Sequence, residues 1–455
     1  MSKLTEVEVE EEPSCKAPHF RVYLSWLRSL GLLKKLDITL ETADLHKEPL
    51  ERVSEVEARI PKSTPPPAAP PHLQNERTVT MKNFNWTGGL FLIGYHILLL
   101  VSLPLYLLYM PLNPGLMVAA FVLYVLAAMG ITAGYHRFYS HKTYKPHKPL
   151  EAVLLSMGTL AIQGSALEWS HDHRLHHRHV DTDEDPYQTR DGFWYSHLLW
   201  MFKKRKPLQE QGVADLMENS LVHFQHRHYG LLVAATNMIP VVFLGWLFED
   251  YIGAFVIALL ARIFLVHHST WFINSLAHMW GSKPFSTEHS AVNNWILSLF
   301  TMGEGYHNYH HTFSGDYRNG VRWYQYDITK LLIWLAGQLG LASDLRRVRT
   351  STIRKKLILV DRKLMLRKIR EKNQPALNQL EKEIVKIADS LVAKLSDWEN
   401  LVNNLRSQQK ARNEGLRRRV RVDLLALKKS IREESRSWTR LCRQVLETPV
   451  VSSQS

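Results

Sequence analysis

Four long apolar runs limit what this chain of 455 residues can fold into. The runs cover residues 88–110, 116–133, 230–248 and 251–273. Each is close to the ~20 apolar residues with which an α-helix crosses the hydrocarbon core of a bilayer. An α-helix also satisfies its own backbone hydrogen bonds, which lipid cannot do. The runs therefore predict an all-α membrane protein with four transmembrane helices.

Shorter features divide the rest of the chain. A fifth apolar stretch, residues 150–167, contains Gln163 and predicts an interfacial or buried helix rather than a fifth span. Residues 61–72 form a Pro-rich linker, and residues 20–33 before it favour a short amphipathic helix. We expect three parts, namely an N-terminal segment over residues 1–75, a membrane core over residues 76–345 and a charged helical region over residues 346–455.

The charged C-terminal region repeats apolar residues at helical spacing. The seam consists of Leu377, Leu380, Ile384, Ile387, Leu391, Trp398, Leu401 and Leu405. Lys394 interrupts this seam. The spacing approximates the apolar seam of a coiled coil, so it predicts a helical hairpin or a modest coiled coil.

Nine histidines stand close to the predicted ends of the spans. They are His136, His141, His173, His176, His177, His278, His307, His310 and His311. Neutral imidazole is a good ligand for iron, zinc, copper and nickel. A single zinc site uses about four ligands, so these imidazoles exceed what one ion needs. The pattern predicts two adjacent metal ions, and it favours redox or hydrolytic chemistry over a structural site.

The spacing of the histidines also suits two metals. Residues 173–177 and 307–311 share the pattern HxxHH. On a helix with about 100° per residue, the last two histidines of each pattern diverge by about 100°, so each can serve a different metal. Asn274 and His278 are four residues apart, on one face of a helix. Together, four elements can enclose a dinuclear site. They are the two HxxHH patterns, the pair of Asn274 and His278, and the HxxxxH pair of His136 and His141.

The order of spans and histidines predicts the sidedness of the protein. Four crossings place the ends of the second and fourth runs on the same side of the membrane as both termini. Each of the nine histidines follows one of these two ends in the sequence. Residues 203–206 are consecutive cations and residues 346–370 are also basic, whereas the two opposite loops lack Lys and Arg. By the positive-inside rule the histidine side is cytosolic. Arg262 lies inside the fourth run, so it should face protein or a polar cavity.

The net charge limits the possible binding partners, and the cysteine content indicates the redox compartment. The net charge of +14 at pH 7 suits nucleic acid, anionic lipid or acidic substrates. No nucleic-acid-binding motif of the usual kinds is present, and the spans favour a membrane surface, so we expect no nucleic-acid partner. Cys15 and Cys442 give no disulfide framework, which suits a reducing compartment.

At these residues the chain resembles the membrane acyl-CoA delta-9 desaturases, the stearoyl-CoA desaturase family. The matching stretches are GITAGYHRFYSH, EWSHDHRLHHRHVDTDEDPY, GFWYSH, WFINSLAH and GEGYHNYHHTFSGDYRNG, and with RWYQYDITK they look most like the fungal branch. The resemblance covers residues 79–344. It implies a four-span protein of the endoplasmic reticulum membrane with a cytosolic cap around two Fe²⁺ ions. The implied reaction uses O₂ to introduce a cis delta-9 double bond into a saturated acyl-CoA such as stearoyl-CoA or palmitoyl-CoA.

Carried over by position, the resemblance implies two iron sites. One iron would bind His136, His141, His173, His177 and His310. The other would bind His176, His278, His307, His311 and, through a water, Asn274. We expect the remaining nearby histidines to lie outside the ligand sets; they are His171, His179, His197, His267, His268 and His289.

The resemblance also implies a bent tunnel for the acyl chain. Its bend matches Gln163, Trp169 and Thr270, and its closed end matches Tyr124 and Ala128. The head-group contacts match Asp172 and Trp271, and the basic pair near the CoA phosphates matches Lys204 and Arg205. The large side chain of Tyr124 is similar to a stop for an eighteen-carbon chain.

The chain departs from the family pattern in three places. His171 replaces an arginine of the animal enzymes, and Gly164 replaces an asparagine that contacts the substrate. The fungal enzymes usually carry a fused cytochrome b5 domain with an HPGG haem motif, which this sequence lacks. An external electron donor, cytochrome b5 with its reductase, is therefore implied.

Two other functions fit parts of the pattern. A membrane fatty-acid hydroxylase uses similar histidine clusters, but NSLAH and GEGYHNYHH favour a desaturase. A histidine-rich metal transporter would place its ligands within the spans, whereas these histidines follow the apolar runs. Analysis of the product distinguishes a desaturase from the hydroxylase. Bound iron and oxygen-dependent consumption of electrons distinguish a desaturase from the transporter.

Overall fold

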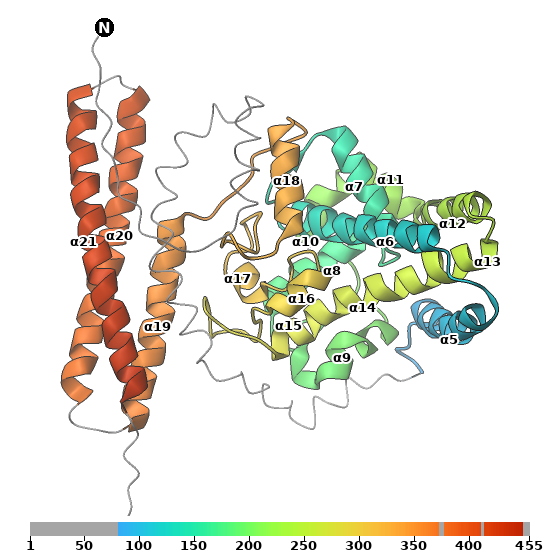
Figure 1. Cartoon of the computed structure of the whole chain (residues 1–455), viewed down its shortest axis with the longest axis horizontal. Helices are drawn as coiled ribbons and strands as arrows, with labels where there is room; N and C mark the ends of the chain where they lie inside the picture. The colour runs from blue at the N-terminus through green and yellow to red at the C-terminus, as the bar shows by residue number, and fades with distance from the viewer. Residues whose placement is uncertain (1–80, 373–376, 411–413, 449–455) are drawn as a thin grey trace, which may run out of the picture. The chain divides into compact units, whose positions relative to one another are not determined.

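The computed structural model describes residues 81–372, 377–410 and 414–448, which are mostly helical (Figure 1). All of them belong to one of the two compact units of the chain, Ile60–Ser455. The predicted linker at residues 61–72 and the predicted helix at residues 20–33 lie outside the described residues.

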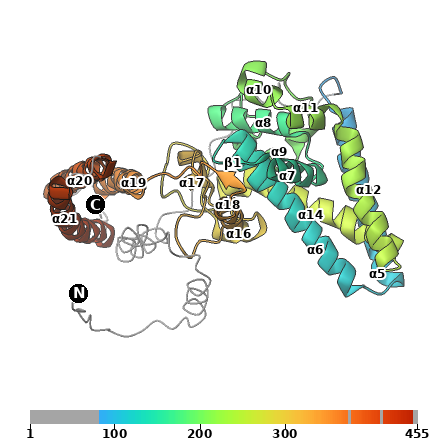
Figure 2. The same cartoon turned by 90° about the horizontal axis from the view of Figure 1, so that it is seen from above.

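Four helices of the described residues are long and apolar enough to cross a membrane, which confirms the predicted spans. The first is α5 (Trp86–Tyr109), and the third is α12 (Tyr229–Leu247). The second consists of α6 (Pro114–Met129) and the π-helix η2 (Gly130–Ser140). The fourth consists of α13 (Tyr251–Gly253), the π-helix η5 (Ala254–Ala261), α14 (Arg262–Asn274) and α15 (Leu276–Met279). Both views show α5, α6, α12 and α14 extending together (Figures 1 and 2).

The second and fourth membrane helices continue past their predicted ends. They end at Ser140 and Met279, whereas the apolar runs end at residues 133 and 273. The histidines His136 and His278 therefore lie on these helices, beyond the ends of the apolar runs. Every residue of η2 except Phe138 is buried against protein. Polar residues can continue the helix there because neighbouring helices replace lipid around it, so hydropathy no longer marks its end.

The fifth apolar stretch forms a buried helix that does not cross the membrane, but it is shorter than predicted. It is α7 (Lys148–Leu160), and α8 (Ala166–His179) begins after a turn. Ile162 and Gly164 adopt positive φ angles of 54° and 97° in this turn, and glycine takes such an angle at no steric cost. Ser165 and Glu168 then form a capping box that starts α8. The stretch predicted as one helix, residues 150–167, is therefore divided between α7 and the start of α8.

Arg262 faces protein, as predicted for a charge inside a span. Its side chain is 2% exposed. It donates hydrogen bonds to the backbone oxygen of Leu160 at 2.6 Å and to Oδ1 of Asn237 at 2.5 Å. A cation at the C-terminal end of a helix is stabilised by the helix dipole. Arg262 thus joins α14 to the end of α7 and to α12.

Short elements form the cap around the histidines. They are η3 (Thr189–Asp191), α9 (Phe193–His197), η4 (Leu199–Phe202), α10 (Glu210–Met217), α11 (Ser220–Arg227), α16 (Trp295–Phe300), α17 (His307–Thr312) and α18 (Ile328–Gln338). Strands β1 (Lys145–Pro146) and β2 (Ala342–Ser343) pair antiparallel and tie the residues before α7 to the end of the core.

The C-terminal region is a bundle of three helices, α19 (Thr350–Lys372), α20 (Asn378–Lys410) and α21 (Glu414–Glu447). The sequence predicts a hairpin, which α20 and α21 form, and α19 adds a third helix to it. Lys394 does not break the core, because it forms an ion pair with Glu434 at 2.9 Å and Leu395 is buried beside it.

Candidate metal centre and substrate pocket

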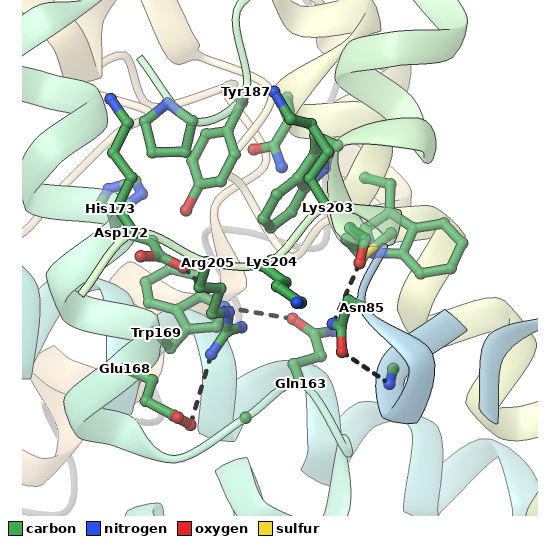
Figure 3. Close-up of a pocket in the computed structure, with 18 of the residues that line it drawn as sticks. Asn85, Gln163, Glu168, Trp169, Asp172, His173, Tyr187, Lys203, Lys204 and Arg205 are labelled. Carbon is green, nitrogen blue, oxygen red and sulfur yellow. Dashed lines mark hydrogen bonds and ion pairs between the residues drawn. The ribbon is translucent and has the colours of Figure 1, made fainter. Parts of the chain in front are cut away.

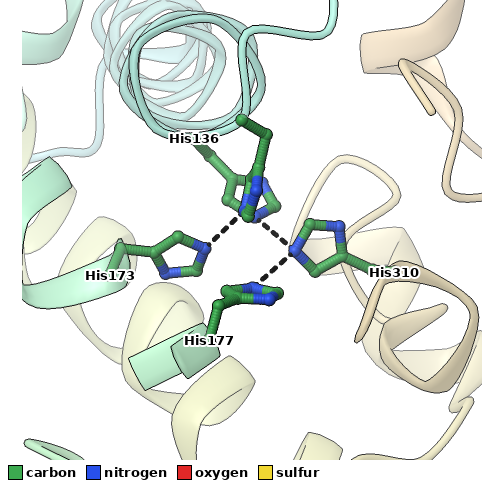
Figure 4. Close-up of side chains that lie close together, drawn as sticks. His136, His173, His177 and His310 are labelled. Atoms are coloured by element: carbon green, nitrogen blue, oxygen red, sulfur yellow. Dashed lines mark hydrogen bonds between the residues drawn. The ribbon is translucent and has the colours of Figure 1, made fainter. Parts of the chain in front are cut away.

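The nine predicted histidines gather in two groups. The first histidine group contains His136, His141, His173, His177 and His310, and the second contains His176, His278, His307 and His311. Within each group, ring nitrogens of all members lie within 4.8 Å of one another. Figure 4 shows His136, His173, His177 and His310 pointing toward one common centre. The structure thus separates the histidines as the resemblance implies.

Helical spacing explains how two short helices supply both groups. In α8, His173 and His177 are four residues apart and reach the first group, whereas His176 reaches the second. In α17 the assignment is reversed: His307 and His311 reach the second group, and His310 reaches the first. On each helix, the two histidines at i and i+4 therefore belong to one group, and the remaining histidine belongs to the other.

The Nε2 atoms of each group face one another at short distances. In the first group, Nε2 of His310 lies 2.9 Å from Nε2 of His136 and 2.9 Å from Nε2 of His177. In the second group, Nε2 of His307 lies 3.1 Å from Nε2 of His278 and 3.0 Å from Nε2 of His311. One nitrogen carries at most one proton, so hydrogen bonds between the rings cannot satisfy all of these contacts.

Acceptor oxygens lie on the far side of three rings and orient them. Nδ1 of His136 lies 2.9 Å from Glu304, and Nδ1 of His176 lies 2.8 Å from Asp185. A carboxylate accepts a proton there, so Nε2 of each neutral ring is a bare lone pair. Lone pairs that converge in this way repel unless a cation lies between them. The donor set therefore fits a metal ion in each group.

The third fixed ring is His278, whose Nδ1 lies 2.6 Å from Oγ of Ser290. The Ser290 hydroxyl donates to Asp181 at 2.5 Å, so its oxygen accepts the proton of His278. The backbone N–H of Ser290 also donates to Asp181, at 2.6 Å. A carboxylate therefore orients this ring too, through one hydroxyl.

Six of the rings outside the membrane helices are held neutral. Burial first, and neighbouring imidazoles second, lower the pKa well below its usual value for His141, His173, His177, His307, His310 and His311. Neutral imidazole is the form that binds a metal. These six rings can thus bind metal at neutral pH without first losing protons.

A buried network of charges holds Glu304. Arg137 donates to Glu304 at 3.0 Å and forms an ion pair with Asp327 at 3.0 Å, and Asn319 donates to Glu304 at 2.5 Å. Burial alone would raise the pKa of Glu304, but Arg137 and His136 hold it below its usual value. Glu304, Asp185 and the Ser290–Asp181 pair were not predicted from the sequence. Their signal is local, because Glu304 lies in GEG before the third cluster and Asp185 in DEDPY after the second.

Asn274 lies at the end of α14. The helix breaks at Ser275, which has φ −106° and ψ −74°, before His278 on α15. The predicted i, i+4 relation therefore crosses a break. Asn274 and the first-group residue His173 both line a pocket next to the histidines.

This pocket collects most of the predicted substrate residues. It encloses about 620 Å³, within the range of pockets that bind small molecules. Seven predicted residues line it, namely Gln163, Trp169, Asp172, Lys204, Arg205, Thr270 and Trp271. Figure 3 shows that the labelled Arg205 and Lys204 lie close to Gln163, Trp169 and Asp172.

Hydrogen bonds join the three residues predicted at the bend. The Gln163 amide donates to the Thr270 hydroxyl at 2.9 Å, and the Trp169 indole donates to the Gln163 oxygen at 3.4 Å. Trp169 also stacks on His173, with ring centroids 5.0 Å apart. The bend residues therefore form one connected wall that touches the first histidine group.

The basic mouth of the pocket is paired with acids. Arg205 lies 3.3 Å from Asp172 and 3.4 Å from Glu168. His171 is buried beside Asp172 at 3.1 Å, and its Nε2 accepts from the backbone N–H of Gln209 at 3.0 Å. The imidazole of His171 thus supports Asp172.

Tyr124 and Ala128 are absent from the residues that line this pocket. Both are buried in α6. The Tyr124 hydroxyl donates to the backbone oxygen of Phe300 at 2.6 Å and lies 3.0 Å from the Ser269 hydroxyl. Their predicted place at the end of a tunnel stays a prediction, because the pocket does not extend to them.

Comparisons with known proteins support one family. The fatty acid desaturase family model matches residues 113–336. A Delta(9)-fatty-acid desaturase of Caenorhabditis elegans is 40% identical over 241 residues, which are 51% of this chain and 70% of that relative. The chain belongs to the fatty acid desaturase family.

Two fungal members of the fatty acid desaturase family are similar over more of the chain. A probable acyl-CoA desaturase of Schizosaccharomyces pombe is 41% identical over 326 residues, 69% of this chain and 66% of the relative. Acyl-CoA desaturase 1 of Saccharomyces cerevisiae is 39% identical over 306 residues, 65% of this chain and 59% of the relative. The chain thus spans less than two thirds of these two fungal fatty acid desaturases.

The carboxylates behind the rings give a first prediction. Glu304→Gln and Asp185→Asn each remove the charge that orients one ring, so both should weaken metal binding by about 10- to 100-fold. The measurement is a titration of the metal-stripped protein with Fe²⁺. Glu288→Gln, at an exposed position of the loop before Ser290, is the control and should bind like the parent. Parental affinity in both buried variants would contradict the orienting role.

Proposed function

We propose that this fatty acid desaturase is an oxygen-dependent acyl-CoA desaturase that forms a cis delta-9 double bond in saturated acyl-CoA. The observation that carries the proposal is the pair of histidine groups with converging bare nitrogens beside a lined pocket. The relatives whose names are acyl-CoA desaturase and Delta(9)-fatty-acid desaturase support the choice of substrate and position.

The metals of the proposal are two iron ions. The first histidine group would hold one and the second group, with a water on Asn274, the other. Imidazole suits iron as well as zinc and copper. Bound iron would supply the oxidising chemistry with O₂ that an unactivated methylene pair requires, since side-chain acids and bases do not attack such bonds. The protein positions the acyl chain and excludes water.

The pocket residues divide between the two ends of the substrate. Lys204 and Arg205 would bind the phosphates of CoA, with Asp172 and Trp271 at the head group. The wall of Gln163, Trp169 and Thr270 would bend the acyl chain past His173, whose stacking on Trp169 brings this wall to the histidines. Tyr124 and Ala128 would close the far end.

The proposal also includes a membrane location and an electron donor for the protein. The chain would lie in the endoplasmic reticulum membrane with its histidine side cytosolic, supported by the basic residues 203–206 on that side. Electrons would come from cytochrome b5 and its reductase. The functional core would be residues 76–345, between the N-terminal segment 1–75 and the C-terminal region 346–455.

The proposal predicts two irons per chain. His176→Ala removes a second-group ligand and His310→Ala a first-group ligand, so each should lower the iron content and abolish desaturation. The measurements are elemental analysis and product formation from stearoyl-CoA. His223→Ala, an exposed histidine of α11, is the matched control and should retain both iron and turnover. Full activity in either ligand variant would refute the two-iron assignment.

The proposed tunnel end predicts a change in chain length. Tyr124→Ala should shift the preference toward longer acyl chains, because it removes the ring at the closed end. Tyr124→Phe separates size from hydrogen bonding: it loses the bond to Phe300 but keeps the ring, so its preference should match the parent. The measurement is competition among acyl-CoAs of different length. An unchanged profile in an active Tyr124→Ala protein would reject this role.

A further inference from the structure

One face of α21 carries an almost unbroken line of cations. The positions follow one another by three or four residues and are Arg418, Val422, Leu425, Lys429, Arg432, Arg436, Arg440 and Arg443. Residues at this spacing share one helix face. All of these side chains are exposed. Two exposed acidic residues, Glu433 and Glu447, lie on the same face, so its six cations outnumber its acids three to one. At 1.5 Å per residue this basic stripe is about 37 Å long.

The rest of the bundle holds the basic stripe outward. The other face of α21 is buried through Val420, Leu424, Ile431, Trp438, Cys442 and Val445. The pair Ser390–Glu434 links α20 to α21 at 2.7 Å, and Lys355–Glu399 links α19 to α20 at 2.7 Å. Both views show α19, α20 and α21 side by side (Figures 1 and 2). The stripe is therefore a fixed surface, because turning α21 would expose its buried face.

Two exposed aliphatic residues interrupt the cations. Val422 is 60% exposed and Leu425 is 67% exposed, one helical turn from Arg418 and Lys429. Exposed aliphatic side chains beside Lys and Arg can enter the headgroup region of a bilayer whose anionic lipids attract the cations. The phosphates of a nucleic acid would contact the cations but offer nothing to this apolar pair.

The exposed face of the neighbouring helix α20 is not predominantly basic. Its exposed face mixes Lys382 and Lys386 with Asp389 and Asp397. Exposed cations recur on α19, at Lys363, Arg367 and Arg370, with Glu371 next to them. The charge is thus distributed unevenly around the described bundle, and the face of α21 carries six cations against two acids.

The chain brings this surface to a membrane. Only residues 344–349 separate strand β2 of the membrane core from α19, and six residues span at most about 20 Å. The bundle is therefore tethered by a short linker to a core whose four spans enter a bilayer, which raises its effective concentration near that bilayer. Anionic lipids on the cytosolic leaflet attract such polybasic segments.

We propose that the basic stripe of α21 binds anionic phospholipid headgroups of the bilayer that holds the spans. Its cations contact the lipid phosphates and carboxylates, and Val422 and Leu425 enter the headgroup region. This role rests on no metal and on no step of the proposed desaturation. Turnover with saturating electron donor therefore does not depend on it.

The test places a reporter on the stripe of the full chain. Leu425→Cys, in a Cys15→Ser background, carries a bimane label, and the protein is placed in nanodiscs of phosphatidylcholine with or without phosphatidylserine. Quenching by a lipid-borne spin label should increase when phosphatidylserine is present and decrease again at high salt, which screens the contact. The same label at Ala393→Cys, on the exposed face of α20, should respond to neither change.

Substitution of the cations completes the test. Arg432→Gln, Arg436→Gln and Arg440→Gln together should remove the response to phosphatidylserine at position 425, whereas Lys382→Gln with Lys386→Gln on α20 should keep it. Unchanged thermal melting shows that both sets fold, since all five side chains are exposed. Equal quenching with and without phosphatidylserine would overturn the proposal. So would a bimane response to added cytochrome b5 in discs where phosphatidylserine has no effect, because the face would then bind an acidic protein.

Discussion

The convergence of bare imidazole nitrogens is the interaction on which the rest of the core depends. Glu304, Asp185 and the Ser290–Asp181 pair place acceptor oxygens against the outer nitrogens of three rings, so lone pairs on the inner nitrogens repel one another until a cation joins them. An unpaired arrangement of this kind is costly in a buried site. The surrounding helices must therefore hold the rings against that repulsion.

The way the helices do this explains several features of the fold. The second membrane helix continues as the π-helix η2 and delivers His136 from within the protein, while α7 packs against it without crossing the membrane. Arg262 anchors the end of α7 to the membrane helices. The turn with positive φ at Gly164 then directs α8 across the site, where its two faces reach both histidine groups. Packing that is remote from the rings thus sets their spacing.

Much of this could be predicted from the sequence, because spans and clusters are local patterns. Four apolar runs gave the membrane helices, and the HxxHH spacing gave the division of His176 and His177 between two groups. The ends of the spans could not be predicted, since protein rather than lipid surrounds η2. The carboxylates behind the rings were missed because a lone Glu304 or Asp185 has no pattern of its own. The third helix of the C-terminal bundle was missed because α19 is too charged for its seam to be noticed.

The central claim is that the two histidine groups serve the desaturation of acyl-CoA. The most direct test expresses the chain in a host without a delta-9 desaturase and determines the acyl chains of its lipids by gas chromatography with mass spectrometry. The account predicts new monounsaturated chains with a cis double bond between carbons nine and ten, at the expense of saturated chains. Hydroxylated chains, a double bond elsewhere, or an unchanged lipid profile from an iron-loaded protein would contradict it.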